Sequence, residues 1–179
     1  KPCPSEGMHL VEHILLRPRF QPPVLSGMQP EDVYKLFDVC LNEHCDFCGE
    51  EDPYSFRITL VLPYWHERFR SMEFRRFFET MVRTETPAHC MIKICWLNNT
   101  LMNAFEVAFK KWIEALADYE RDLIRKQQKQ DRLRMASNAM IDILTRLHSE
   151  YPEARLHDCE TGLTNPVLLD NTVLGTYKL

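Results

Sequence analysis

The residues with the clearest chemical potential lie near the start of the chain, where His9, Glu12 and His13 follow the order H-x-x-E-H. On a helix, two histidines four positions apart share one face and can bind zinc, while the glutamate activates a water molecule for peptide hydrolysis. This order therefore raises the hypothesis of a metallopeptidase, provided that the segment is helical.

The surrounding stretch HLVEHILLRPR is instead rich in aliphatic and β-branched residues and ends at Pro18, which predicts a mostly buried strand over residues 8–17. In a strand the two histidines would stand about 13 Å apart, at roughly 3.3 Å per residue, and Glu12 would point to the opposite face. A metallopeptidase would also need a third ligand, for which Glu73 or Glu79 is available but not singled out. The pattern argues against this enzyme.

A second candidate site lies in the stretch CLNEHCDFCG, whose potential metal ligands are Cys40, His44, Cys45 and Cys48. Cys45-x2-Cys48 followed by Gly49 is similar to half of a zinc knuckle, and structural zinc takes four ligands. Cys90 and Cys95 lie an odd number of positions apart in a predicted strand, so they point to opposite faces and make a poor second pair. Free or packed cysteines are the favoured interpretation, and a structural zinc site is the alternative.

Composition excludes several other functions. The 179 residues include only five glycines, with no G-x-S-x-G and no glycine-rich phosphate loop, which argues against an enzyme. The net charge is −4, and the basic stretch RKQQKQDRLR follows the acidic ADYERD, so a solvated helical face is expected there and nucleic-acid binding is not. Seven cysteines, an odd number, fit a reducing compartment.

The two ends of the chain carry further expectations. No apolar run reaches the roughly 18–20 residues of a membrane span, so none is expected. The opening KPCPSEG is typical of a linker entering a domain, and we expect the chain to be part of a longer protein. The closing TGLTNPVLLDNTVLGTYKL is apolar, β-prone and without helical period, which predicts an extended tail that lies on a partner or on a sheet edge.

The middle of the chain predicts a strand–helix–strand unit over residues 55–97. SFRITLVLPYW alternates, with Phe56, Ile58, Leu60 and Leu62 on one face. Ser71 caps a helix whose core-facing stripe is predicted as Phe74, Phe77, Phe78 and Met81, with Arg75, Arg76 and Glu79 turned away. Pro87 ends that helix, and the strand AHCMIKICWL places Cys90, Ile92, Ile94 and Trp96 on one face. Such a unit usually pairs its strands in parallel.

The remaining elements are helical. A short helix is predicted after Pro30, with Val33, Leu36, Phe37 and Cys40 on its apolar side. Two long amphipathic helices follow the cap residues at 98–100, and they form either a hairpin or one bent rod broken near residue 128, the second ending at Pro152. The predicted fold class is α+β: a small mixed sheet with the strand–helix–strand unit, two long helices and the tail. The expected divisions are an α/β module over 1–98, helices over 99–151 and the extended tail over 152–179.

One resemblance covers roughly residues 8–112. HLVEHILLRPR, DPYSFRITLVLPYW, FRRFFETMVRTETPAH and ICWL resemble the C-terminal region of baseplate J-like wedge components of phage-tail-like extracellular contractile injection systems. The shared pattern is a helix, an acidic residue, T/A-P-A-H, a strand and W-L, here Glu85-Thr86-Pro87-Ala88-His89 leading to Trp96-Leu97. The cysteine-bearing segment 40–48 and the residues after 150 lie outside it.

The resemblance implies a structural subunit and not an enzyme, with no cofactor unless the zinc site exists. It implies a hetero-oligomeric assembly with other baseplate subunits, between sheath and spike, formed in the bacterial cytoplasm as part of a virion-like particle. The long helices and the tail are expected to contact neighbouring subunits. The hypotheses that remain beside it are a small zinc-stabilised binding module and the H-x-x-E-H metallopeptidase.

Overall fold

The computed structural model describes residues 7–19, 33–37, 52–121, 126–151, 153–154 and 173–174. The fold is α+β, as the sequence predicts. In chain order the elements are β1 (His9–Glu12), a 3-10 helix (His13–Leu16), β2 (Arg57–Pro63), α1 (Glu67–Arg70), α2 (Met72–Glu85), β3 (Met91–Leu97), α3 (Asn99–Arg121), α4 (Lys126–Arg146), β4 (Glu153–Ala154) and β5 (Val173–Leu174).

The sheet has three strands in the order β1-β2-β3. β2 and β3 are parallel, with Leu60 opposite Ile94, which confirms the pairing predicted for the strand–helix–strand unit. β1 joins the same sheet in the antiparallel sense, with Val11 opposite Thr59. A separate parallel pair joins β4 to β5.

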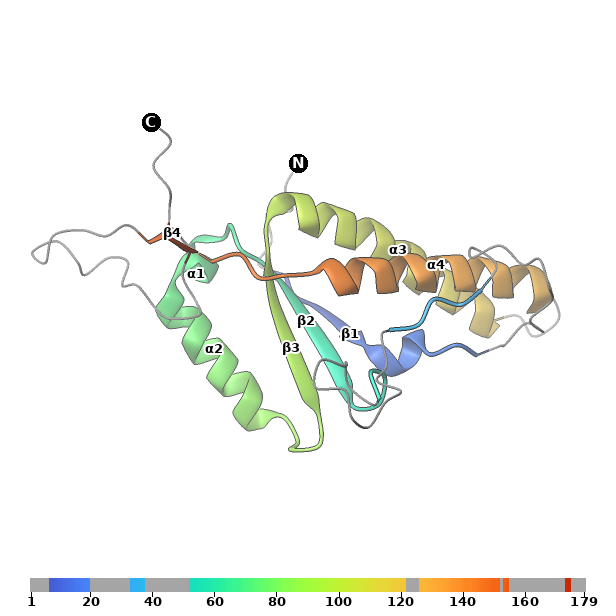
Figure 1. The fold of residues 1–179 in the computed structure, drawn as a ribbon, viewed down its shortest axis with the longest axis horizontal. Helices are drawn as coiled ribbons and strands as arrows, with labels where there is room; N and C mark the ends of the chain where they lie inside the picture. Colours follow the sequence, from blue (N-terminus) through green and yellow to red (C-terminus); the bar gives the residue numbers. More distant parts are fainter. Residues whose placement is uncertain are drawn as a thin grey trace, which may run out of the picture.

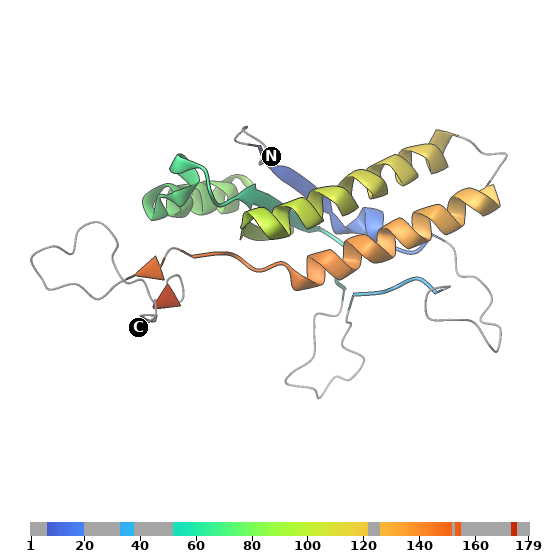
Figure 2. The same ribbon diagram turned by 90° about the horizontal axis from the view of Figure 1, so that it is seen from above.

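The sheet is covered on both faces (Figure 1). α1 and α2 lie on one face, where Leu60, Leu62, Phe69 and Trp96 form one buried cluster. α3 and α4 lie side by side on the other face as a hairpin, which decides between the two predicted arrangements (Figure 2). Their apolar sides join β1, β2 and β3 in a larger cluster that includes Val11, Val61, Leu97, Phe105, Trp112 and Met140.

Several predicted boundaries change. The strand expected over 8–17 ends at Glu12, and His13–Leu16 form the 3-10 helix, which carries Leu16 into the larger cluster at 1% exposure. α4 ends at Arg146, earlier than Pro152, because the next residues run along the free edge of β3. There Glu150 N donates to Trp96 O, and Ser149 Oγ donates to Ile94 O. This segment therefore satisfies backbone groups that an edge strand leaves unpaired.

The helix predicted around residues 33–37 is wrong. These residues run without helical structure beside α4, where Asn138 replaces the missing helical hydrogen bonds. Its Nδ2 donates to Val33 O over 2.8 Å, and its Oδ1 accepts from Lys35 N over 2.7 Å. The Asn138 side-chain amide thus supplies one donor and one acceptor to this segment, as the backbone of a neighbouring strand would. Cys40, the end of that predicted helix, lies outside the described residues.

The predicted face of α2 is also wrong in part, although its cap and length are right. Ser71 Oγ accepts from Phe74 N, and the helix ends two residues before Pro87. Phe77 is 65% exposed and Met81 41% exposed, whereas Arg75 is 1% exposed. The face on the sheet is that of Phe74, Phe78 and Val82. The helix is rotated because Arg75 finds buried hydrogen-bond acceptors that the apolar pattern does not reveal.

Candidate functional site

The histidines of the H-x-x-E-H order do not share a helix. His9 lies in β1 and directs Nε2 to Glu106 Oε1 on α3, 3.4 Å away. His13 begins the 3-10 helix, with Nδ1 3.0 Å from Pro53 O and Nε2 2.8 Å from Thr59 Oγ1. The two imidazoles thus have separate partners on separate elements, so the helical geometry that the peptidase motif requires is not formed.

The other proposed zinc ligands divide into two groups. Glu79 is on α2 across the sheet from His9 and accepts a hydrogen bond from Trp96 Nε1 over 2.9 Å. Glu73 lies in the first turn of the same helix. Within the described ranges, no three His, Cys, Asp or Glu side chains gather as a metal site would require. The second candidate set, Cys40, His44, Cys45 and Cys48, lies outside the described residues, so that site stays a prediction.

His13 occupies a buried polar position. Its ring stacks on Phe37 with centroids 5.0 Å apart. Burial lowers the pKa of His13 below its usual value of 6.5, and the charges of Arg57 and Lys93 add to this effect, while the hydrogen bond to Pro53 opposes it. In the neutral ring Nδ1–H donates to the Pro53 carbonyl, and Nε2 accepts from the Thr59 hydroxyl. This arrangement joins the 3-10 helix to β2 and is structural.

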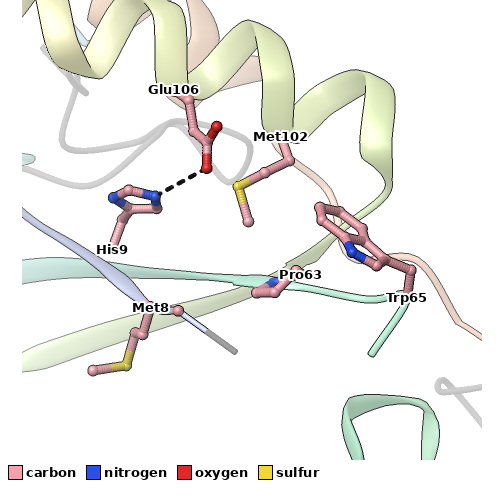
Figure 3. Close-up of a pocket in the computed structure, with 7 residues that line it drawn as sticks. Met8, His9, Pro63, Trp65, Met102 and Glu106 are labelled. Atoms are coloured by element: carbon pink, nitrogen blue, oxygen red, sulfur yellow. Dashed lines mark hydrogen bonds and ion pairs between the residues drawn. The ribbon is translucent and has the colours of Figure 1, made fainter. Parts of the chain in front are cut away.

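A cavity opens between the start of β1, the end of β2 and the first turns of α3 (Figure 3). It encloses about 180 Å³. Its lining is Gly7, Met8, His9, Pro63, Trp65, Met102 and Glu106. His9, Met102 and Glu106 point into the space, whereas the side chain of Met8 turns to the other side of the strand (Figure 3). The cavity is therefore apolar at the Trp65 end and acidic at the Glu106 end.

The acidic end is only loosely satisfied. The Glu106 side chain is 40% exposed. Its contact with His9 is 3.4 Å long, whereas charge-assisted N–H···O hydrogen bonds are typically about 2.7–2.9 Å long. Phe105 and Phe109 hold the His9 ring from the α3 side, with centroids 5.4 Å and 5.0 Å away. The fixed imidazole leaves Glu106 with room for a further hydrogen-bond donor.

A second polar centre is buried on the opposite face of the sheet. The Arg75 guanidinium lies between two aromatic rings, with Cζ 5.2 Å from the Tyr64 centroid and 4.8 Å from that of Trp96. Nε donates to Phe69 O and Nη1 to Glu150 O, while Nη2 has no hydrogen-bond partner among the residues described. Burial lowers the pKa of Arg75 from its usual value. This guanidinium ties three segments together.

One flank of α2 carries apolar side chains that the described chain covers only in part, since Phe77 is 65% exposed and Met81 41%. Arg75 and Glu79 reach the β3 edge of the sheet, so Phe77 and Met81, about 200° around the helix from them, face the β1 side. On β1, Leu10 is 45% exposed and shares the α2 face of the sheet with its partner Leu60. We call Leu10, Phe77 and Met81 the α2-side apolar strip.

Sequence reasoning found His9 but not the cavity. Apart from Gly7 and Met8, which directly precede His9, the residues that line the cavity lie 54 to 97 positions further along the chain, and no motif links them to His9. The one local signal is the spacing of Met102 and Glu106, which places both on the same face of a helix.

None of the described helices has the length and apolar character to cross a membrane. Comparison with protein-family models and with curated proteins gives no match.

Proposed function

We propose that this chain is a structural subunit of the baseplate of a contractile injection system, similar to the C-terminal region of baseplate J-like wedge components. The resemblance of residues 8–112 names the kind of assembly. The observation that supports an assembly role is the α2-side apolar strip, whose members are 41% to 65% exposed. Apolar side chains gathered on one face are typical of protein interfaces.

The proposal moves the expected interface. The long helices were expected to contact neighbouring subunits. Most apolar side chains of α3 and α4 pack against each other and the sheet, although Val107, Ile113 and Met135 stay 40% to 65% exposed. The strip is favoured over them because one of its members lies on β1, which is an edge strand within the described part of the chain. An interface built from an edge strand and a helix flank brings both backbone and apolar contacts to a neighbouring subunit.

The test uses the full chain in cells that produce the particle. Replacing both Phe77 and Met81 by Ser should lower the yield of sheathed particles by about tenfold or more, because truncating a central aromatic contact typically costs roughly 2 kcal/mol or more of binding, and 1.4 kcal/mol is already about tenfold. Met135 is the matched control, since it is also 65% exposed but lies on α4. Electron microscopy of particles from the two strains gives the yield.

Each result has one meaning. Loss of particles with Phe77→Ser/Met81→Ser and normal yield with Met135→Ser supports the proposal, provided that the purified variant unfolds at the same urea concentration as the parent. Normal particles from the double variant contradict it. Phe77, Met81 and Met135 are 41% to 65% exposed, so each substitution by Ser is expected to change the free energy of unfolding by no more than about 0.5 kcal/mol.

A further inference from the structure

The cavity of Figure 3 has the chemistry of a cation site. At one end the Glu106 carboxylate offers a negative charge that is 40% exposed and weakly engaged by His9. At the other end Trp65 and Met102 offer an indole ring and a thioether. A ligand that satisfies both ends must be elongated, with an apolar stem and a positively charged head.

The Glu106 carboxylate favours a guanidinium over an ammonium as the charged group of the ligand. A guanidinium is planar, carries several N–H donors and pairs with a carboxylate through two parallel hydrogen bonds. An ammonium supplies the charge but not the planar pair. The volume of about 180 Å³ is sufficient for one such side chain.

The position of the cavity opening indicates that the ligand is a side chain of a polypeptide lying along β1. The cavity begins at Gly7 and His9, at the start of β1, and the described residues pair no strand with the outer edge of β1. A polypeptide added along that edge presents alternate side chains on each face of the sheet. One of them, on the face of His9, would stand at the cavity entrance.

We infer that the cavity receives an arginine side chain from a partner protein strand laid along β1. The guanidinium pairs with Glu106, and the methylene stem lies against Trp65 and Met102. The statement that the partner is a protein rests on the assembly role proposed above. The cation site itself rests only on the lining of the cavity.

The first experiment measures the site with n-butylguanidinium, which copies the arginine side chain. Titration into the 15N-labelled full chain should shift the indole N–H resonance of Trp65, assigned with Trp65→Phe. In Glu106→Gln the probe should bind about tenfold more weakly, the effect of losing a hydrogen bond to a charged group. Glu114→Gln is the control, because Glu114 is exposed on the same helix and does not line the cavity.

Two further probes decide the specificity. n-Butylammonium should bind more weakly than n-butylguanidinium, and n-butanol should leave the Trp65 resonance unmoved. Equal shifts from n-butanol, or equal n-butylguanidinium affinity in the parent and Glu106→Gln, would overturn the cation site. Stronger binding of n-butylammonium would overturn the choice of arginine. The exposed fraction of Glu106 makes misfolding of its amide variant unexpected, and a urea unfolding curve checks this.

The particle assay separates this inference from the proposed function. Particles lost with Glu106→Gln as well as with Phe77→Ser/Met81→Ser support both statements. If the double variant loses particles while Glu106→Gln assembles normally, the assembly role stands and the protein partner of the cavity is wrong. If the double variant assembles normally but the probe binds through Glu106, the proposed function fails and the cation site remains.

Discussion

Arg75 Nη1 donates to the backbone carbonyl of Glu150 over 2.7 Å, which joins α2 to a segment 75 positions further along the chain. Nε of the same guanidinium donates to Phe69 O over 2.6 Å. Residues 147–150 depend on this contact and on the β3 edge for their position. Arg75 therefore holds the end of the helical hairpin against the strand–helix–strand unit.

Replacing Arg75 by Ala is expected to lower the free energy of unfolding by about 2–4 kcal/mol, because the buried Phe69 carbonyl and the partly buried Glu150 carbonyl lose their donor and a cavity opens between Tyr64 and Trp96. Arg75→Lys should recover only part of the loss, since one ammonium does not copy the spacing of Nε and Nη1. Urea unfolding gives the values. The neighbouring Arg76 is exposed, so a comparable loss in Arg76→Ala would contradict this account.

Asn138 provides a second long-range contact that is testable one hydrogen bond at a time. Asn138→Ala should remove the donor to Val33 O and the acceptor for Lys35 N, and cost about 1–2 kcal/mol. The amide of Lys35 should then exchange with solvent faster. Asn138→Asp keeps the acceptor, so it should preserve the protection of Lys35. Unchanged exchange in Asn138→Ala would show that other contacts hold this segment, and Asn103→Ala, at an exposed position on α3, is the control.

Local patterns predicted much of the fold. The alternation in β2 assigned Ile58, Leu60 and Leu62 to one face correctly, because a strand has a fixed period of two and both faces are covered here by apolar residues. Ser71 and Pro87 marked the limits of α2, since capping and helix termination act through neighbouring residues. Asn98 likewise caps α3, where its Oδ1 accepts from Leu101 N.

The misplaced features depend on distant partners. The stripe Phe74, Phe77, Phe78 and Met81 fits the helical period, but so does a face rotated toward Arg75. The choice is made by the carbonyls of Phe69 and Glu150, which a periodic pattern does not contain. The cavity at His9 was missed for the same reason, because Glu106 is 97 positions away.

His13 gives the chain a pH-dependent stability of defined sign. Its pKa is lowered in the folded state, so between that value and 6.5 the unfolded chain binds more protons. The free energy of unfolding should therefore be constant near pH 7.5, begin to fall as the pH drops past 6.5, and level off with respect to His13 below its folded pKa. His13→Gln should flatten this part of the curve, measured by urea unfolding from pH 7.5 to 5.

The control for His13 is a substitution that removes no titratable group, Asn103→Ala at an exposed position on α3. It should leave the slope of unfolding free energy against pH unchanged. A parent protein whose stability does not vary between pH 7.5 and 5, or a His13→Gln variant with the parental slope, would contradict the assignment of a buried neutral imidazole between Pro53 and Thr59.

Asp52 titrates at much lower pH for a different reason. Hydrogen bonds from the Ser55 side chain, and from the backbone N–H groups of Ser55 and Tyr54, lower its pKa from 3.8 to about 2. Because the folded-state pKa is the lower one, the stability that this turn contributes is present above pH 3.8 and is lost as the pH falls toward 2. Ser55→Ala should raise the pKa of Asp52 in a 13C-carboxyl NMR titration, because its hydroxyl donor is removed and the two backbone donors remain. Thr84→Ala, on α2, should leave that titration unchanged, and an Asp52 that titrates near 3.8 in the parent would show that the turn does not form.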